Sequence, residues 1–231
     1  MGPFASAEFI NTIYEENLPE FSEQESPRLI LSSDPSIPDR TVSIYSNQEK
    51  EIVSRLNMGW TNLKAAGAEI FIIPCMTSHF YWNLYPLEMQ RFTVNLVELV
   101  QMKLCQETNR YLLLATKGTY NSGLLSFKNV LIPNLEDIKQ IHQLIYTIKC
   151  SGKNTEILDK AQEKVEDLLV RYQADGWICG CTELHLLAKK MIKREDTHSL
   201  IIDPLLILAK NWISLDGFLY PVVFNTTTYC P

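Results

Sequence analysis

Two cysteines occupy equivalent places in the sequence, each at the end of an apolar run. Cys75 follows residues 68–74 and Cys181 follows residues 176–180, and a threonine comes within two positions of each thiol. Short apolar runs rich in β-branched side chains predict strands that are buried on both faces, as in a parallel sheet. Because open parallel sheets bind ligands where their strands end, we expect both thiols to lie at a ligand site.

The residue types permit acid–base chemistry, with metal binding and simple structural burial as alternatives. A cysteine thiolate can act as a base, a nucleophile or a metal ligand, whereas a buried neutral cysteine behaves as a small hydrophobic residue. His79 and His185 each follow one of the two cysteines by four positions, but the sequence lacks the Cys-x-x-Cys spacing typical of zinc sites. We therefore expect no metal, and the symmetric placement of Cys75 and Cys181 favours a shared catalytic role.

Predicted strands and helices alternate along the chain, which indicates an α/β fold with a parallel sheet and right-handed crossovers. Apolar runs predict strands at residues 28–31, 68–74, 111–115, 129–133, 176–180 and 199–202. Helical spacing of apolar residues predicts helices at residues 4–14, 48–66, 87–105, 135–149, 154–172, 184–192 and 204–212. The first predicted element is a helix, so we expect the usual first strand of a doubly wound fold to be missing.

Four of the predicted strands end in segments that carry Gly, Thr, Cys or charged side chains. These segments are residues 32–41, 74–79, 116–119 and 180–183. Since the carboxyl ends of parallel strands share one edge of a sheet, we expect the four segments to converge on a single site.

Composition and charge exclude several functional classes. The chain has 231 residues, a formal net charge of −6 and a pI near 5.3, which argues against the clustered Lys and Arg of a nucleic-acid-binding protein. No apolar run approaches the roughly 20 residues of a membrane-spanning helix, and residues 1–8 lack the pattern of a secretory signal. We expect a cytoplasmic protein with free cysteine thiols, no nucleic-acid partner and no membrane partner.

Six short motifs, in the same order along the chain, resemble those of the aspartate/glutamate racemase family, with the closest likeness to the aspartate racemases. The motifs are Met1-Gly-Pro-Phe-Ala, Ile37-Pro-Asp-Arg-Thr41, Pro74-Cys-Met-Thr-Ser-His79, Thr116-Lys-Gly-Thr119, Gly180-Cys-Thr-Glu183 and Ile202-Asp-Pro204. The resemblance implies two similar doubly wound, flavodoxin-like halves with the active site between them. We expect residues 1–95 plus 204–231 to form the half with Cys75, and residues 96–203 to form the half with Cys181.

The resemblance also implies cofactor-independent racemisation of a small acidic amino acid, aspartate foremost and glutamate as well. Cys75 and Cys181 match the family's paired cysteines, of which one removes the α-proton while the other returns a proton to the opposite face. Arg40 and Lys149 match the cations that hold the substrate carboxylates. The other substrate-binding residues expected from the motifs are Gly2, Met76, Thr77, Thr116, Thr119 and Thr182, with His79 and Glu183 in supporting positions. The family uses no metal or pyridoxal phosphate, and it forms homodimers.

Two residues in the motif at 74–79 depart from the family pattern. Met76 stands where the family has asparagine, which removes an amide that could hydrogen-bond the substrate, and Ser78 replaces an alanine. These departures and the missing strand leave two alternatives open. One is a racemase-like protein that binds an acidic ligand without turning it over. The other is a superfamily relative that acts on another small acid, of the hydantoin racemase, maleate isomerase or decarboxylase type.

Overall fold

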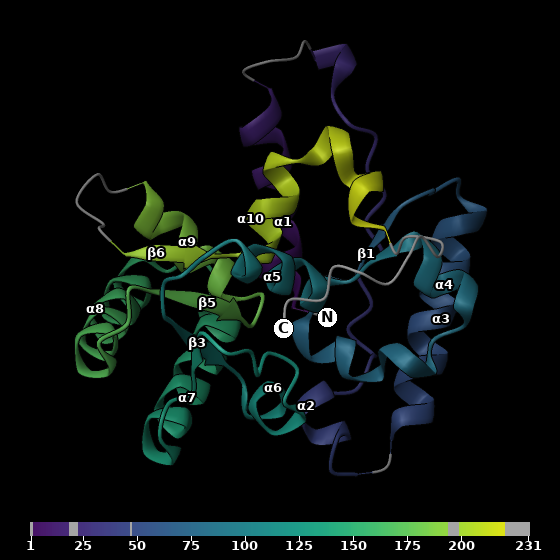
Figure 1. Cartoon of the computed structure of the whole chain (residues 1–231). Coiled ribbons are helices and arrows are strands. Elements are labelled where there is room, and N and C mark those ends of the chain that lie inside the picture. The colour runs from purple at the N-terminus through teal and green to yellow at the C-terminus, as the bar shows by residue number, and fades with distance from the viewer. Residues whose placement is uncertain (1, 19–22, 47, 194–198, 220–231) are drawn as a thin grey trace.

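The computed structural model of the chain describes residues 2–18, 23–46, 48–193 and 199–219 (Figure 1). The strands are β1 Phe71–Ile72, β2 Thr93–Val94, β3 Tyr111–Ala115, β4 Val130–Leu131, β5 Gly176–Gly180 and β6 Leu200–Ile202. The α-helices are α1 Pro3–Asn17, α2 Arg40–Ser43, α3 Glu49–Ala65, α4 Leu87–Phe92, α5 Leu96–Cys105, α6 Lys117–Ser122, α7 Leu135–Ser151, α8 Thr155–Tyr172, α9 Leu184–Ile192 and α10 Pro204–Lys210. Short 3₁₀ helices occur at η1 Glu23–Glu25, η2 Met76–Leu84 and η3 Trp212–Phe218.

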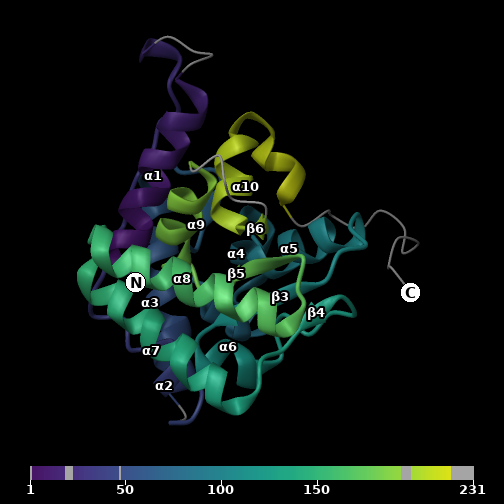
Figure 2. The ribbon, with the colours of Figure 1, turned by 90° about the vertical axis from the view of Figure 1, so that its left-hand side faces the viewer.

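The larger of two sheets has the strand order β4-β3-β5-β6, and all its pairings are parallel. Successive residues of β3 face opposite sides of this sheet. Leu113 belongs to a core shared with α5 and α10, whereas Leu112 and Leu114 belong to a core shared with α7, α8 and α9. Figure 2 shows α7 and α8 in front of this sheet. Burial on both faces explains why β3 and β5 read as continuous apolar runs in the sequence.

The smaller sheet consists of β1 and β2, which pair in parallel through Phe71 with Thr93 and Ile72 with Val94. Helix α3 covers it with Ile52 and Trp60, which are buried in the same apolar cluster as Phe71. Tyr81 and Trp82 of η2 complete this cluster. The sheet therefore has its own core, and β1 leads directly into the turn that carries Cys75.

The predicted parallel α/β architecture is confirmed, and the chain opens with helix α1 as expected. The strand predicted at residues 28–31 is wrong, because no strand in the described part of the chain lies beside that segment to form a ladder with it. The single helix predicted at residues 87–105 is also wrong. It is interrupted by β2, and Asn95 then starts α5 by accepting hydrogen bonds from the backbone N–H groups of Val97 and Glu98.

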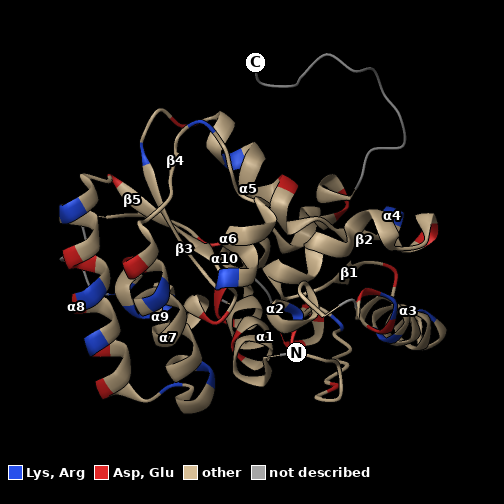
Figure 3. Cartoon of the chain, turned by 90° about the horizontal axis from the view of Figure 1, so that it is seen from below, with Lys and Arg blue, Asp and Glu red and all other residues tan. Residues whose placement is uncertain are grey.

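Figure 3 shows Lys, Arg, Asp and Glu spaced along the helices that cover the sheets, α8 among them. Helix α8 illustrates the pattern, since Lys160 pairs with Glu156 one turn away while Leu158 and Leu168 are buried against the sheet. None of the helices in the described ranges is long and apolar enough to cross a membrane. The five cysteines within those ranges are free thiols.

We expect Leu113→Ala to lower the free energy of unfolding by about 2–5 kcal/mol, because it leaves a cavity in a strand buried on both faces. Urea denaturation followed by circular dichroism measures the change. The matched control is Val170→Ala, on the exposed side of α8, for which we expect a change within about 0.5 kcal/mol. Equal effects of the two substitutions would contradict the assignment of β3 to the core.

Candidate active site

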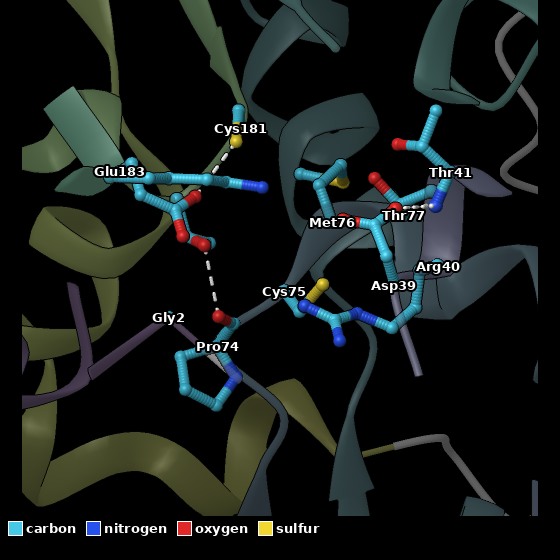
Figure 4. Close-up of a pocket in the computed structure, with 12 residues that line it drawn as sticks. Gly2, Asp39, Arg40, Thr41, Pro74, Cys75, Met76, Thr77, Cys181 and Glu183 are labelled. Atoms are coloured by element: carbon cyan, nitrogen blue, oxygen red, sulfur yellow. Dashed lines mark hydrogen bonds between the residues drawn. The ribbon is translucent and has the colours of Figure 1, made fainter. Parts of the chain in front are cut away.

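A small cavity lies where β1 and β5 end, between the two sheets (Figure 4). Both cysteines line it, and Figure 4 shows Cys75 beside Arg40 on one side and Cys181 beside Glu183 on the other. The expected residues Gly2, Met76, Thr77, Lys149 and Thr182 also line it, together with Asp39, Thr41 and Pro74. The cavity measures about 10 Å³, which is room for about one water molecule. Segments that are far apart in the sequence therefore converge on one small site.

Arg40 supplies a fixed cation beside the first thiol. Its guanidinium lies beside Cys75 (Figure 4), and Nη1 donates to two carbonyl oxygens of the preceding turn at 2.8 and 3.3 Å. Burial disfavours the charge, but Cys75, Asp39 and Glu183 outweigh burial and raise the pKa of Arg40. Its Nε is buried and has no hydrogen-bond partner among the described residues. The guanidinium is thus positioned to stabilise negative charge on Cys75 and retains a free donor.

Cys181 lies in the opposite electrostatic setting. Its Sγ–H donates to Oε2 of Glu183 at 2.8 Å, and both side chains are buried. Burial raises the pKa of the Cys181 thiol well above its ordinary value, Glu183 raises it further, and Lys149 partly opposes both effects. Cys181 is therefore a neutral thiol that already holds a proton for donation.

Lys149, on α7, is the second cation of the site. Its Nζ lies 4.5 Å from the ring centroid of Tyr146. Burial works against its charge, but Cys181, Glu183 and Cys75 outweigh burial and raise the pKa of Lys149. Lys149 therefore remains charged at neutral pH and can bind an anionic group.

Asp39 and Tyr146 connect the two sides of the site. Asp39 starts α2 by accepting hydrogen bonds from the N–H groups of Thr41 and Val42, while its other oxygen accepts from the hydroxyl of Tyr146 at 2.9 Å. Burial alone would raise the pKa of Asp39, but these hydrogen bonds and the neighbouring Lys149 lower it. Asp39 is therefore an ionised carboxylate in the lining of the cavity.

Three threonine side chains form a hydrogen-bonded group behind the cavity wall. Thr77 lines the cavity, and its hydroxyl lies 3.3 Å from that of Thr116 and 3.0 Å from that of Thr119. Thr116 and Thr119 are buried and do not line the cavity. Thr182 lies across from this group, and its hydroxyl donates to the carbonyl oxygen of Pro74 at 2.9 Å. These threonines thus hold the loops in place, and of the four only Thr77 and Thr182 line the cavity.

His79 supports the Cys75 turn from behind and does not line the cavity. Its Nε2 accepts from the N–H of Leu96 at 3.2 Å, so Nδ1 carries the proton and donates to the carbonyl oxygen of Cys75 at 3.0 Å. Burial lowers the pKa of His79, which keeps the ring neutral. The neutral tautomer therefore fixes the turn after β1 against the start of α5.

Gly2 and Met76 line the cavity without contributing a polar side chain. A Cβ atom at Gly2 would lie 2.0 Å from Oε1 of Glu183, so a larger residue there would displace the Glu183 carboxylate. Met76 stands where the family has asparagine and is 1% exposed, so a buried apolar side chain fills that position. No group of three or more His, Cys, Asp or Glu side chains suited to a metal occurs in the described part of the chain.

Comparison with known proteins agrees with the motifs. A family model described as Asp/Glu/Hydantoin racemase matches residues 1–211. The chain belongs to this racemase family. The solved structure of Picrophilus torridus aspartate racemase is 25% identical to it, with a TM-score of 0.75 over 94% of this chain and 91% of that one. An aspartate racemase homologue from Pyrococcus horikoshii OT3 is 22% identical, with a TM-score of 0.66 over 93% of this chain and 95% of that one. The protein is accordingly an isomerase of the racemase type.

The sequence motifs do not identify Asp39, which lines the cavity, or its partner Tyr146 as site residues. Asp39 directly precedes Arg40 in its motif, and an aspartate at the start of a helix such as α2 is the signal that points to it. Tyr146 lies three residues before Lys149 on α7, so helical spacing alone places the two side chains on one face. Glu183 was expected in a supporting position but lines the cavity itself.

We expect Glu183→Gln to lower the pKa of Cys181, because it removes a negative charge that disfavours the thiolate. The pH dependence of iodoacetamide alkylation at Cys181, followed by peptide mass spectrometry, measures the shift. The matched control is Glu163→Gln, an exposed acid on α8, which should leave the titration unchanged. An unchanged or raised midpoint in Glu183→Gln would contradict the charge interaction.

Proposed function

We propose that the protein racemises a small acidic amino acid, aspartate in particular, through Cys75 and Cys181 as an acid–base pair and without a cofactor. One observation carries the proposal: two thiols line the same small cavity, one beside a cation and the other beside a carboxylate. Cys75 lies beside the guanidinium of Arg40, whereas the thiol of Cys181 donates to the carboxylate of Glu183. The first setting suits a thiolate base and the second suits a thiol acid.

The reaction then consists of two proton transfers. The thiolate of Cys75 removes the proton from the α-carbon, and the thiol of Cys181 delivers its proton to the opposite face. Cys75 ends as a thiol and Cys181 as a thiolate, so the protein is ready for the other enantiomer or returns to its starting state through solvent. Lys149 stabilises the thiolate that forms at Cys181, since its charge already acts on that sulfur.

The charged groups match the substrate that we propose. An acidic amino acid carries two carboxylates and one ammonium group, and the cavity offers two cations, Arg40 and Lys149, together with the carboxylate of Asp39. The partnerless Nε of Arg40 is a donor that a substrate carboxylate can satisfy. Helix α1 begins beside Gly2, so the positive end of its dipole also favours an anion here. Cations at the carboxylates lower the barrier by stabilising the carbanion-like transition state.

The cavity must widen to admit substrate, because a volume of about 10 Å³ holds no amino acid. The hydrogen bonds from Thr182 to Pro74 and from Tyr146 to Asp39 join the two sides of the cavity. Both must lengthen when the sides separate. A tight site of this kind favours aspartate over the longer glutamate.

In deuterated water, we expect deuterium to enter the α-position of both L- and D-aspartate when the protein is present. Cys75→Ser and Cys181→Ser should each reduce racemisation by about 10²–10⁴-fold, the usual contribution of a general acid or base. Each variant should lose exchange first from the enantiomer whose proton the missing thiol removes. Proton NMR of the α-proton and chiral chromatography measure exchange and inversion separately.

The exposed thiol of Cys150 provides the matched control, and Cys150→Ser should keep full activity. Glutamate and a hydantoin extend the panel to the alternatives within the superfamily. If no α-proton exchanges in any of these compounds while aspartate still binds in calorimetry, the protein is a binding module and the racemase proposal fails.

We expect Arg40→Lys to raise KM for aspartate at least about tenfold, because lysine cannot provide the paired N–H donors of a guanidinium. Steady-state kinetics of the variant measure the effect. Arg171→Lys is the matched control. Arg171, on α8, pairs with Asp137 of α7 and Asp167 of α8 and lies outside the cavity. An unchanged KM in Arg40→Lys would remove Arg40 from the substrate site.

A further inference from the structure

The Ile202-Asp-Pro204 motif does not line the cysteine cavity. Asp203 follows β6 and starts α10, where its Oδ1 accepts a hydrogen bond from the N–H of Leu205 at 3.0 Å. Its Oδ2 lies 2.5 Å from Nδ1 of His185 on α9. Asp203 is 2% exposed and His185 is 0% exposed. The motif therefore provides a buried carboxylate that pairs with a buried histidine.

The other ring nitrogen of His185 faces α1. Its Nε2 lies 2.8 Å from the hydroxyl of Thr12, which is fully buried and also donates to the carbonyl oxygen of Glu8. Because a carboxylate only accepts, Nδ1 donates to Asp203. Threonine, histidine and aspartate are the residue types of a nucleophilic triad, but buried side chains meet no substrate. The ring instead joins α9 to α1 and α10, and Figure 2 shows these three helices together.

His185 belongs to the turn that carries the second cysteine. The N–H of Leu184 donates to the carbonyl oxygen of Cys181 at 3.0 Å, and the N–H of His185 donates to that of Thr182 at 3.2 Å. His185 follows Cys181 by about one helical turn. Holding the ring at both nitrogens therefore holds the backbone from which the thiol of Cys181 projects.

Helix α1 also confines Glu183, which accepts the proton of the Cys181 thiol. Gly2 lies so close that a Cβ atom there would be 2.0 Å from Oε1 of Glu183, while Oε2 accepts from Sγ of Cys181 at 2.8 Å. The carboxylate thus lies between the start of α1 and the thiol. A shift of α1 relative to α9 would change the contact between Glu183 and Cys181.

A second buried contact joins α1 and α9 about one turn further along α9. Nζ of Lys189 lies 2.5 Å from Oε1 of Glu8 and 3.0 Å from Oε2 of Glu15. Burial alone would raise the pKa of Glu8, but Lys153 and Lys189 outweigh burial and lower it. Separating such a pair leaves a buried charge without its partner, which is strongly unfavourable. The two helices are therefore fixed against sliding along each other.

We propose that His185, held by Asp203 and Thr12, is a positioning residue for Cys181. It fixes the first turn of α9 so that the carboxylate of Glu183 meets the thiol, and it does not touch the substrate. The consequence for catalysis rests on the proposed function, because Cys181 is the acid of that reaction. The position of the thiol itself can be measured without any substrate.

The first test compares iodoacetamide alkylation of Cys181 in the full-length protein, His185→Leu and Glu183→Gln by peptide mass spectrometry. Leucine makes neither contact of the imidazole ring, so Glu183 should no longer meet the thiol. We expect alkylation of His185→Leu at neutral pH to be at least about threefold faster than in the unaltered protein. The double variant should react no faster than Glu183→Gln alone, because His185 acts through Glu183.

Two variants separate positioning from a general loss of stability. His185→Asn keeps an N–H donor near the place of Nδ1 and should alkylate within about twofold of the unaltered protein. Asn17→Ala is the matched control, since Asn17 is buried on α1 and donates to the carbonyl oxygens of Ile13 and Ala209. It should lower the free energy of unfolding and leave alkylation of Cys181 unchanged. If His185→Leu does not fold, Thr12→Val removes only the contact at Nε2 and should accelerate alkylation in the same direction.

The second test measures steady-state racemisation of aspartate. We expect His185→Leu to lower kcat about tenfold and to leave KM within about twofold, because the ring makes no contact with substrate. His185→Asn should recover most of the lost kcat.

Unchanged alkylation of Cys181 in His185→Leu and Thr12→Val would overturn the proposal, and so would an equal acceleration in Asn17→Ala. A raised KM with an unchanged kcat in His185→Leu would overturn it as well. If the unaltered protein racemises nothing but alkylation of Cys181 responds as expected, the racemase function fails and the positioning role of His185 is supported.

Discussion

The hydrogen bond from Thr182 to the carbonyl oxygen of Pro74 holds the site together. It joins the end of β5 to the end of β1, and these are the strands that deliver the two cysteines. Pro74 directly precedes Cys75 and Thr182 directly follows Cys181. One side chain therefore sets the position of each thiol relative to the other, although the two strands belong to different sheets. His79 and the threonine group fix the turns around this hydrogen bond. The hydrogen bond therefore determines where both thiols lie.

The site contains two cations and two carboxylates in a protein whose formal net charge is −6. Arg40 and Lys149 are balanced by Asp39 and Glu183, so the buried charges compensate one another before any ligand arrives. The balance is local, however, because Arg40 acts on Cys75 while Glu183 acts on Cys181. Two chemically identical side chains therefore have different charged neighbours, a guanidinium at Cys75 and a carboxylate at Cys181.

Sequence patterns predict the helices and strands whose own residues show a characteristic apolar run or spacing. β3 and β5 were visible because strands buried on both faces read as apolar runs, and α7 and α8 were visible because their apolar residues recur at helical spacing. The segment at 28–31 carries an apolar run too, but a strand also requires a neighbour, which no local pattern reports. The likeness to the family motifs predicts Thr116 and Thr119 as site residues. The fold shows that their hydroxyl groups hydrogen-bond to Thr77 behind the cavity wall. Contacts between distant segments, such as Asp39 with Tyr146, exist only after folding.

Pro74 lines the small cavity and also a second cavity of about 900 Å³ beside β1. The same residue accepts the hydrogen bond from Thr182 through its carbonyl oxygen. The packing around the smaller sheet therefore reaches the cysteines through the residue that directly precedes Cys75.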